Sequence, residues 1–492
     1  MSRPGSAARQ ILKQRLVRSL RVLALLLTLA GCVACATMAE QGLLPEVQAR
    51  QAPAVSLGPE FSVQDNMPLG YNAEAKAVVT RDGHGHVFVI DKERAVHHIE
   101  IAGTDVLRRE TIGVVTGAPS GFSRPDAVEH PPGSLRLVAG DKMFVRSETG
   151  VWAEIKGNRC ERFVPVGEDL LCTFIAKGED LGAPTRTDWL VGWFILIPVA
   201  LPREVQAEKL VIAQDSPDGW TILAVLDPEA TLSARSDYVL GADRSGLQFL
   251  YRSSGGSSWF LIGGGPYGGG FVGGDSSDQH ISYARVDYAT LFQRTPDSDA
   301  GTKDHPAGWL RVAGSPLPAP PFADRWPAKA FAKEFWRDPL DRRFTVNGAL
   351  GNIESLFHLT FTIRDGGRTL GGLEQPWVAV RLSGDRWVPG VDIVAADDLP
   401  DPGYRWGRDW RALIRSDVHG HNHVLLESSR KGSFDICYFV KGAAGWSAPI
   451  VLGGNLPPFA LRDLALGDKG NAFAVWKDRN DTVKGRWISP QK

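Results

Sequence analysis

Two short segments of the sequence place histidines beside an aspartate in the same order, Asp-x-His-Gly-His. The first segment is residues 82–86, and the second, which continues to a further histidine, is residues 417–423. Together they contain five of the 11 histidines: His84, His86, His419, His421 and His423. Alternate residues of an extended strand lie on one face, so the histidines of each segment could converge. With the Asp82 or Asp417 carboxylate, such imidazoles would suit Zn²⁺ or another divalent transition metal.

The same residues have a purely structural interpretation. Gly, Asp, Asn and His are common in the turns that join strands, where they adopt conformations that other residues avoid. Both segments are then strand-connecting turns at equivalent places in a repeat, which is the interpretation that we favour. A metal site shared by the two segments requires that they lie close together, as they would if they belonged to the first and seventh units of a closed ring.

Two of the five cysteines frame a predicted hairpin. Cys160 and Cys172 flank a strand at 162–166, a Gly-Glu-Asp turn and the beginning of a second strand. A disulfide between them would form in an oxidising compartment. Two separate buried thiols fit the sequence equally well, because the sequence does not give the Cβ geometry. Cys437 lies in an apolar run at 434–440 that predicts a buried strand.

Short strands are the elements that must position these residues. Of the 492 residues, 43% are hydrophobic, including 21 Phe and 15 Trp, so the chain can bury a large core and is not disordered as a whole. The 54 Gly and 32 Pro follow no short period, which indicates many turns and not a fibrous repeat. Strands are predicted at 77–81, 86–90, 96–101, 135–139, 143–146 and 151–155, and the best helix candidate, 327–335, is short.

A weak internal repeat organises the strands. A turn with Gly or Asn followed by an alternating strand occurs at 85–90, 246–251, 422–426 and 470–475, each preceded within a few residues by an aspartate. A tryptophan that opens a strand after a turn recurs seven times from Trp152 to Trp487, with a mean spacing of about 56 residues. Units of this length fit the blades of a β-propeller, in which each small sheet is covered by its neighbours.

We therefore predict an all-β chain folded as a β-propeller of about seven blades. Six or eight blades are the alternatives, and a set of unrelated β-sandwiches is the competing fold. The aspartate turns are expected between strands one and two of a blade, and the tryptophans at the start of strand three. The repeat resembles that of sialidase-like and other bacterial propellers, although the string nearest to the sialidase Asp-box, Ser216 to Thr221, is compressed.

The N-terminus carries the features of a secretory signal. Residues 1–31 contain six basic and no acidic side chains, an apolar run fills 22–30, and small residues precede Cys32. The four residues Leu29-Ala30-Gly31-Cys32 resemble the lipobox of bacterial lipoproteins. The resemblance implies that a signal peptide is cleaved off before Cys32 and that Cys32 is acylated. An ordinary secretory signal that happens to contain a cysteine is the alternative.

The resemblance also implies a destination. Residue 33 is Val33 and not the Asp that usually retains Gram-negative lipoproteins in the inner membrane, so the outer membrane, facing the periplasm, is expected. Cleavage would leave 49 basic and 56 acidic side chains, a net charge of −7 that disfavours nucleic acid as a partner. The predicted organisation is a signal peptide at 1–31, a lipidated tether with an entering strand at 32–70, and the propeller at 71–492.

One apolar segment stands apart from the repeat. Residues 189–201 contain two Trp and no charged side chain, with Gly192 and Pro198 inside, and 13 residues are too few to cross a bilayer unaided. We favour a buried pair of strands. An exposed apolar loop that touches a membrane or a partner is the alternative.

The sequence leaves three functions open. The leading hypothesis is a membrane-anchored, non-catalytic propeller that binds a protein or carbohydrate in the cell envelope, with the lipid bilayer as the partner of its acylated N-terminus. An envelope hydrolase of the glycosidase type on the same fold is the first alternative, and carboxylates or arginines that converge near the ring axis would favour it. A metal-binding propeller that uses the two histidine segments is the second alternative.

Overall fold

The fold is known from a computed structural model, which divides the chain into two units, Met1–Arg50 and Gln51–Lys492. All described residues belong to the second unit. They are residues 54–491 without 68–74, 117–124, 156–159, 178–180, 182–185, 195–196, 206–207, 217–218, 227–230, 233–237, 256–257, 266–267, 276–277, 293–308, 318–339, 366–367, 384–385, 389–411, 431–432 and 443–444. Cys32 and the predicted helix at 327–335 lie outside the described residues.

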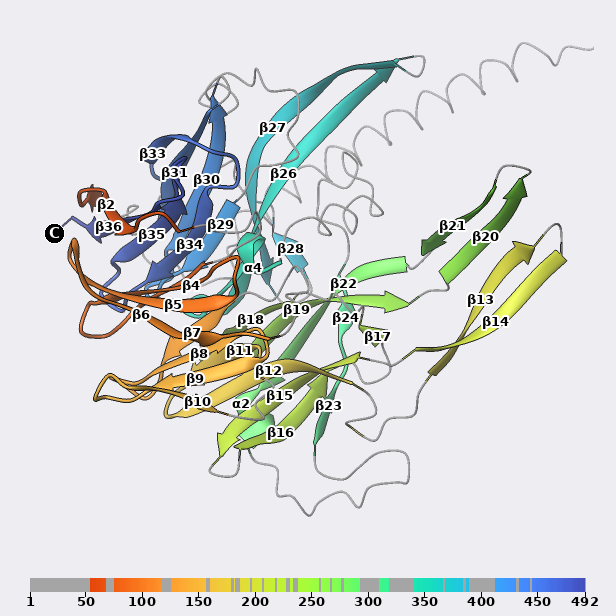
Figure 1. Ribbon diagram of the computed structural model, residues 1–492, viewed down its shortest axis with the longest axis horizontal. Coiled ribbons are helices and arrows are strands. Elements are labelled where there is room, and N and C mark those ends of the chain that lie inside the picture. Colours follow the sequence, from red (N-terminus) through yellow and green to blue (C-terminus); the bar gives the residue numbers. More distant parts are fainter. Residues whose placement is uncertain are drawn as a thin grey trace, which may run out of the picture. The chain divides into compact units, whose positions relative to one another are not determined.

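The described strands form seven blades, in each of which the first strand is the innermost. Figure 1 labels the strands of each blade. Blade 1 contains β3 (Ala75–Val79), β4 (Gly85–Ile90), β5 (Ala95–Ala102) and β6 (Asp105–Val114). Blade 2 contains β7 (Asp126–Glu129), β8 (Leu135–Ala139), β9 (Lys142–Arg146) and β10 (Trp152–Ile155). Blade 3 contains β11 (Arg162–Val166), β12 (Asp169–Lys177), β15 (Glu208–Ser216) and β16 (Gly219–Leu226).

Blades 4 to 6 repeat this order, and β17 (Thr231–Leu232) joins blade 3 to blade 4 by pairing with both β15 and β19. Blade 4 contains β18 (Tyr238–Ala242), β19 (Gly246–Gly255), β22 (Asp278–Asp287) and β24 (Ser315–Pro316), while β23 (Leu310–Val312) pairs with β16. Blade 5 contains β25 (Phe344–Asn347), β26 (Asn352–Asp365), β27 (Arg368–Ser383) and β28 (Arg386–Val388). Blade 6 contains β29 (Ala412–Ser416), β30 (Asn422–Arg430), β31 (Ser433–Gly442), β32 (Gly445–Trp446) and β33 (Ile450–Leu456).

Blade 7 combines the two ends of the described chain. Its inner strands are β34 (Leu461–Leu466), β35 (Ala472–Lys477) and β36 (Val483–Pro490), and its outer edge is made by β1 (Val55–Leu57) and β2 (Phe61–Gln64), which both pair with β36. The pairing of Val55 with Pro490 therefore ties the first described strand to the last one. Since β1 and β2 belong to the sheet of blade 7, part of the segment at 32–70 is built into the propeller.

The seven innermost strands contact one another in a closed circuit. β3 contacts β7, and contacts continue through β11, β18, β25, β29 and β34 back to β3. This circuit makes the structure a seven-bladed β-propeller, as the length of the repeat predicts. The number of blades predicted from the tryptophan spacing is therefore confirmed, although one tryptophan of the series, Trp259, lies outside the blades.

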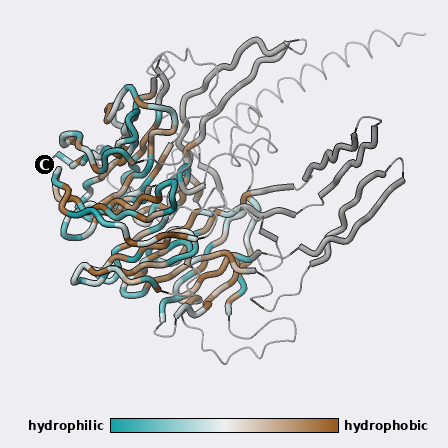
Figure 2. The backbone as a smooth tube through the Cα atoms, viewed as in Figure 1, coloured by the Kyte–Doolittle hydropathy of each residue, from teal (hydrophilic) through white to brown (hydrophobic). Residues whose placement is uncertain are grey.

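The hydrophobic core is divided among the interfaces between blades. Phe88 and Phe144 share the cluster between blades 1 and 2, Phe473 and Val87 share that between blades 7 and 1, and Trp476 packs between blades 6 and 7. Because a blade is covered on both faces, its second strand reads as a continuous buried run in β4 and β35. Figure 2 shows hydrophobic residues recurring along the blade strands and hydrophilic ones at the turns.

Two hairpins are inserted at the same connection of adjacent blades. β13 (Arg186–Phe194) and β14 (Ile197–Val205) lie between β12 and β15 of blade 3, and β20 (Ser258–Gly265) and β21 (Gly268–Asp275) lie between β19 and β22 of blade 4. β13 and β20 pair in parallel, so the four strands form one sheet in the order β14-β13-β20-β21, the inserted sheet. The strand pair expected at 189–201 is present as β13 and β14, whereas its predicted burial concerns side chains outside the described set.

Helices are short in the described residues: α2 (Tyr288–Phe292) and α4 (Leu340–Arg343). Among those residues, no helix has the length and apolarity needed to span a bilayer. The six strands predicted between 77 and 155 are present as β3, β4, β5, β8, β9 and β10, each within two residues of its predicted bounds.

The expected position of the tryptophans is wrong for most blades. Four of them stand at the start of the fourth strand and not the third: Trp152, Trp220, Trp387 and Trp446. Only Trp487 lies in a third strand, β36. The space between two blades widens away from the axis, so the outer strand has more room for an indole; the Trp152 ring meets Phe88 of blade 1 edge-on at 5.8 Å between ring centroids.

Candidate functional site

The predicted histidines gather at the turns that join the first and second strands of the blades. We call these turns the collar (residues 80–84, 130–134, 167–168, 243–245, 348–351, 417–421 and 467–471). Six of the seven collar turns contain a glycine with a left-handed backbone, with φ from 62° to 91°: Gly83, Gly133, Gly167, Gly351, Gly420 and Gly470. An L side chain rarely adopts such a conformation, which explains the glycines at these turn positions. The prediction that the aspartate turns join strands one and two is confirmed.

The collar shows that the two histidine motifs are aligned differently from their sequence pattern. Thr80 N donates to His84 O, and Asp417 N donates to His421 O, so the turns superpose with His84 on His421. The shared string Asp-x-His-Gly-His instead matches His84 with His419, two residues out of register. The residue-by-residue match of the two motifs was therefore wrong. Both aspartates cap their turns, but Asp417 is the first residue of its turn and Asp82 is the third.

Contacts between neighbouring turns place the collar on one face of the ring. Arg81 Nε of blade 1 lies 3.9 Å from Asp468 Oδ2 of blade 7, and Arg81 N donates to Glu129 Oε2 at the end of β7 at 2.8 Å. His130 Nε2 of blade 2 donates to Glu168 O of blade 3 at 3.1 Å. These links join the turns of blades 7, 1, 2 and 3.

The other side of the circuit is joined in the same way. Asn347 Nδ2 of blade 5 donates to Gly420 O of blade 6 at 3.0 Å, and Gln248 Nε2 of blade 4 donates to Gly351 O of blade 5 at 3.1 Å. A Cβ built on Gly470 of blade 7 would lie 3.8 Å from the ring of His419 in blade 6. The innermost strands therefore all end toward the collar face.

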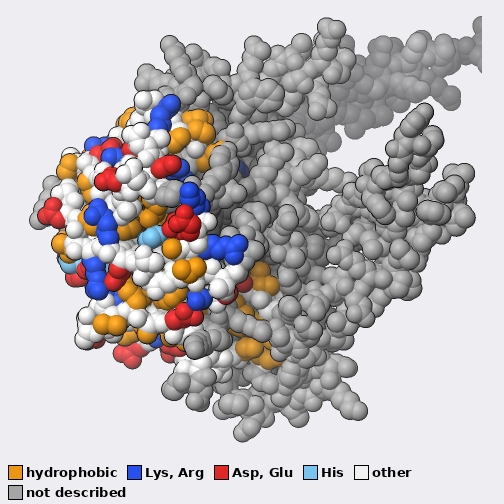
Figure 3. Space-filling view, viewed as in Figure 1, with side chains coloured by type: hydrophobic (Ala, Val, Ile, Leu, Met, Phe, Trp, Pro, Cys, Tyr) orange, Lys and Arg blue, Asp and Glu red, His pale blue; other side chains and the backbone are white. Residues whose placement is uncertain are grey.

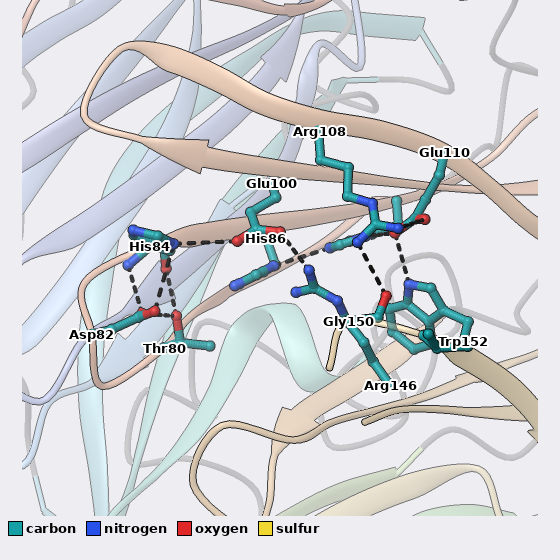
Figure 4. Close-up of polar contacts among 12 residues, drawn as sticks. Thr80, Asp82, His84, His86, Glu100, Arg108, Glu110, Arg146, Gly150 and Trp152 are labelled. Atoms are coloured by element: carbon teal, nitrogen blue, oxygen red, sulfur yellow. Dashed lines mark hydrogen bonds and ion pairs between the residues drawn. The ribbon is translucent and has the colours of Figure 1, made fainter. Parts of the chain in front are cut away.

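His84 lies at the end of the blade 1 turn and shares a carboxylate with an arginine of blade 2 (Figure 4). Its Nδ1 is 3.3 Å from Glu100 Oε1 on β5 and 3.5 Å from Asp82 Oδ2. The Thr80 hydroxyl donates to Asp82 Oδ1 at 2.5 Å, and Arg146 Nη2 donates to Glu100 Oε2 at 2.6 Å. Burial alone would raise the pKa of Glu100, but Arg146 holds it below its ordinary value.

Two residues further on, His86 enters a buried chain of polar groups. Its Nδ1 lies 3.0 Å from His98 Nε2, and His98 Nδ1 lies 2.9 Å from Glu110 Oε1. A carboxylate can only accept, so His98 donates from Nδ1 and, when neutral, accepts from Nδ1–H of His86. The exposed fraction is 2% for His86 and 0% for His98. The sequence analysis did not identify His98, whose partnership follows from the pairing of β4 with β5.

Both buried imidazoles resist protonation. Burial, reinforced by the positive charge that His98 would carry, lowers the pKa of His86 from 6.5 to about 3. Burial also lowers the pKa of His98, against the opposing effect of its hydrogen bond to Glu110. The pair is therefore neutral at pH 7, with the proton positions set by Glu110.

The chain from His86 continues across the interface between blades 1 and 2. Trp152 Nε1 donates to Glu110 Oε1 at 3.0 Å, and Arg108 binds Glu110 Oε2 at 3.0 Å while donating to Gly150 O at 3.1 Å. These contacts, together with Arg146–Glu100, make the cluster a connection between two blades. Its hydrogen bonds and ion pairs join groups of the two blades, so this arrangement supports an interface role.

The second histidine segment is organised around Asp417. Its carboxylate accepts from His419 N at 2.9 Å and His421 N at 2.8 Å, and binds the rings of His421 at 3.0 Å and His423 at 3.3 Å. His423 Nδ1 lies 2.6 Å from the hydroxyl of buried Tyr438. Burial opposes the negative charge, but the hydrogen bonds of His423 and His421 hold the pKa of Asp417 far below its ordinary value.

The two histidine segments do not form one site. His84 and His86 belong to blade 1, and His419, His421 and His423 belong to blade 6, with blade 7 between them. The condition for a shared metal site, that the two segments belong to the first and seventh blades, is therefore not met. Within the described part of the chain, no group of three or more His, Cys, Asp or Glu is arranged to hold a metal ion. The ring nitrogens described above bind other side chains of the same blades.

Three charged residues on the innermost strands were not predicted from the sequence. Lys76, Asp126 and Asp463 each stand four residues before the first residue of their collar turns, so they are equivalent positions. Lys76 Nζ binds Asp126 Oδ1 at 2.9 Å, and Arg415 Nη2 lies 3.4 Å from Asp463 Oδ1. Burial would lower the pKa of Lys76, but Asp126 and Asp463 outweigh it and raise the pKa. The fixed distance from the turn was the signal that could have identified them.

These inner carboxylates satisfy the free edges of adjacent blades. Asp463 Oδ2 accepts from Ala77 N of β3 at 2.9 Å, and Asp126 Oδ2 accepts from Phe163 N of β11 at 2.8 Å. An innermost strand has no further strand to pair with, so its edge amides need such acceptors. Carboxylates on innermost strands are a feature expected of a hydrolase on this fold, but Asp126 and Asp463 are both bound to amides and cations.

The cysteines fall into three environments. Cys160 and Cys172 are joined by a disulfide across the β11–β12 hairpin, with their Cα atoms 5.6 Å apart. Cys437 is a free, half-buried thiol on β31, and burial raises its pKa to about 11. Cys32 and Cys35 lie outside the described residues.

The visible surface of the described blades has no region of a single charge sign. Figure 3 shows Lys and Arg interspersed with Asp and Glu over that face. The collar contributes some of the most exposed side chains, with 66% of the Arg81 side chain and 70% of the Asp468 side chain accessible.

No protein-family model and no curated protein sequence matches the chain. Similar solved structures include Drosophila semaphorin 1a, extracellular domains 1–2, with 11% identity over 90% of this chain and 89% of that chain and a TM-score of 0.40. A six-bladed β-propeller fungal lectin, Aleuria aurantia lectin, has 12% identity over 80% and 99%, with a TM-score of 0.28. The intramolecular trans-sialidase from Ruminococcus gnavus has 9% identity over 87% and 96%, with a TM-score of 0.31. These likenesses indicate neither a ligand nor an activity for this chain.

Proposed function

We propose that the protein is a bacterial lipoprotein of the outer membrane, a β-propeller held at the periplasmic face by acyl chains on Cys32. The observation that carries the proposal is the string Leu29-Ala30-Gly31-Cys32 directly after the apolar run at 22–30. Two or more acyl chains anchor a protein stably, because each buried CH₂ contributes about 0.8 kcal/mol. The mature chain then starts at Cys32 and enters the propeller at β1.

We further propose that the anchored propeller binds a protein or carbohydrate and does not act on it chemically. The proposal is supported by the two carboxylates Asp126 and Asp463 of the innermost strands, which bind edge amides as well as cations. The collar offers exposed side chains of both charge signs, Arg81 of blade 1 and Asp468 of blade 7, as well as exposed apolar ones, Leu350 of blade 5 and Val418 of blade 6. Such a mixed surface suits a partner with both polar and apolar groups.

Metabolic labelling with a palmitate analogue tests the anchor. The wild type is expected to incorporate the label and to fractionate with the outer membrane, whereas Cys32→Ser incorporates none. The matched control is Cys35→Ser, which removes the neighbouring thiol and keeps the string before Cys32. Label that persists in Cys32→Ser, or is lost in Cys35→Ser, contradicts the proposal.

A glycan array probed with the purified protein tests the binding role and separates it from the hydrolase. Retention of an unchanged glycan supports binding. Release of new reducing ends from a retained glycan supports the hydrolase and contradicts the non-catalytic role.

A further inference from the structure

The inserted sheet is the part of the described chain that neither the repeat nor the collar explains. It consists of the hairpins β13–β14 and β20–β21, which arise from the connection between the second and third strands of blades 3 and 4. Successive strands of a blade are antiparallel, so this connection lies at the opposite end of the blade from the collar turn. The collar and the inserted sheet therefore belong to opposite faces of the ring.

The register of the inserted sheet gives apolar residues to both of its faces. Val191 pairs with Trp259 and Trp193 with Leu261, which assigns these four residues to one face. Phe194 pairs with Ile197 on one side and with Ile262 on the other, which assigns them to the second face. A sheet that packs on a protein core has a polar second face when water covers it. The register therefore places apolar residue types on both faces of this part of the sheet.

The charged residues of the inserted hairpins are confined to their bases. β13 begins with Arg186 and reaches Asp188 before its apolar part, and β14 leaves its apolar part at Arg203 and Glu204. Trp189 follows Asp188 at this boundary. Charged bases, a tryptophan at the boundary and an apolar end are the arrangement of segments that enter the headgroup region of a bilayer.

We propose that the ends of the inserted sheet dip into the same bilayer that holds the acyl chains of Cys32. The inference rests on the proposed lipid anchor. Residues 33–54 separate Cys32 from β1, and 22 residues can extend to about 75 Å, so the tether allows this contact. β14 and β21 are the edges of an open sheet, and unpaired edge groups are costly in hydrocarbon, so the sheet enters the interface without crossing the membrane. The collar would then face the periplasm.

An environment-sensitive fluorophore at the end of the inserted sheet tests the contact. The full lipidated chain, with Cys35→Ser and Cys437→Ser, carries either Phe194→Cys or the control Thr104→Cys. Thr104 is exposed in the turn between β5 and β6, a connection on the collar face. Both proteins are labelled with a nitrobenzoxadiazole probe and reconstituted into phosphatidylcholine–phosphatidylglycerol vesicles that contain lipids brominated on their acyl chains.

The probe at position 194 is expected to be quenched about twofold by brominated acyl chains, as a group at the headgroup–acyl boundary would be, and the probe at 104 to be unaffected. Ile262→Cys, whose backbone pairs with Phe194, should reproduce the result if Phe194→Cys misfolds. Equal, unquenched emission from protein that floats with the vesicles overturns the inference and leaves the anchor intact. A blue shift without bromine quenching assigns the sheet to a second copy or a protein partner and also overturns it. Protein that does not float contradicts the proposed anchor itself.

Discussion

The buried pair His86–His98 should make the propeller sensitive to mild acid. The pKa of His86 is lowered from 6.5 to about 3, so the folded state excludes a proton that the unfolded chain binds below pH 6.5. The free energy of unfolding is therefore unaffected by the titration of His86 above pH 6.5, and it decreases as the pH falls from 6.5 toward the folded-state pKa of about 3. At pH 5, 1.5 units below the unfolded value, the loss from His86 alone is about 2 kcal/mol. The groups that face it, Glu100, Arg146, Asp82 and His98, are included in this shift.

Urea unfolding at pH 7.5 and pH 5.0, followed by tryptophan fluorescence, measures the loss. His86→Phe is the test variant, because blade 7 holds buried Phe473 at the equivalent position. The free energy of unfolding should fall by about 2 kcal/mol less in this variant than in the wild type between the two pH values. Phe88→Leu, which disturbs the same cluster without removing a titrating group, should lose the same stability at both pH values. A pH dependence that is unchanged by His86→Phe would show that His86 is not the group whose protonation destabilises the fold.

Three further predictions concern single structural features. Lys76→Met removes the cation from Asp126 and should lower the free energy of unfolding by about 1–3 kcal/mol in urea, whereas an unaltered midpoint would show that the ion pair contributes nothing. Gly83→Ala meets no neighbouring atom within 4 Å but forces a side chain to φ 91°, so thermal unfolding should show a cost of about 1 kcal/mol, with Gly83→Asn closer to the wild type. Replacing Cys160 and Cys172 together by Ala opens a loop of separation 12 and should cost about 3 kcal/mol; equal stability of the reduced and oxidised wild type would contradict this.

The fold could be predicted from the sequence because its signals are local. A collar glycine such as Gly470 marks a backbone conformation that only a few residues adopt, so the turns and the strands beside them recur at readable positions. The blade count followed from their period. The position of the tryptophans within a blade could not be predicted from this period. The outer strands are short, and the inserted hairpins, which contain Trp259, interrupt the series.

The candidate site was predicted only in part, since its partnerships are not local. His86 was singled out, but its contact with His98 depends on the register of β4 against β5, and the link to Trp152 crosses to another blade. The histidine motifs matched each other two residues out of register, because a capping aspartate occurs at different positions in the two turns. The motif alone does not show at which position of a turn the capping aspartate stands.

The mass of the N-terminal peptide of protein purified from membranes tests the lipid anchor. The mature chain is expected to begin at Cys32 and to carry a diacylglyceryl group on its sulfur and an acyl group on its amine. An N-terminus elsewhere, or a Cys32 with an unmodified thiol, would contradict the central claim that this propeller is held at a membrane by lipid.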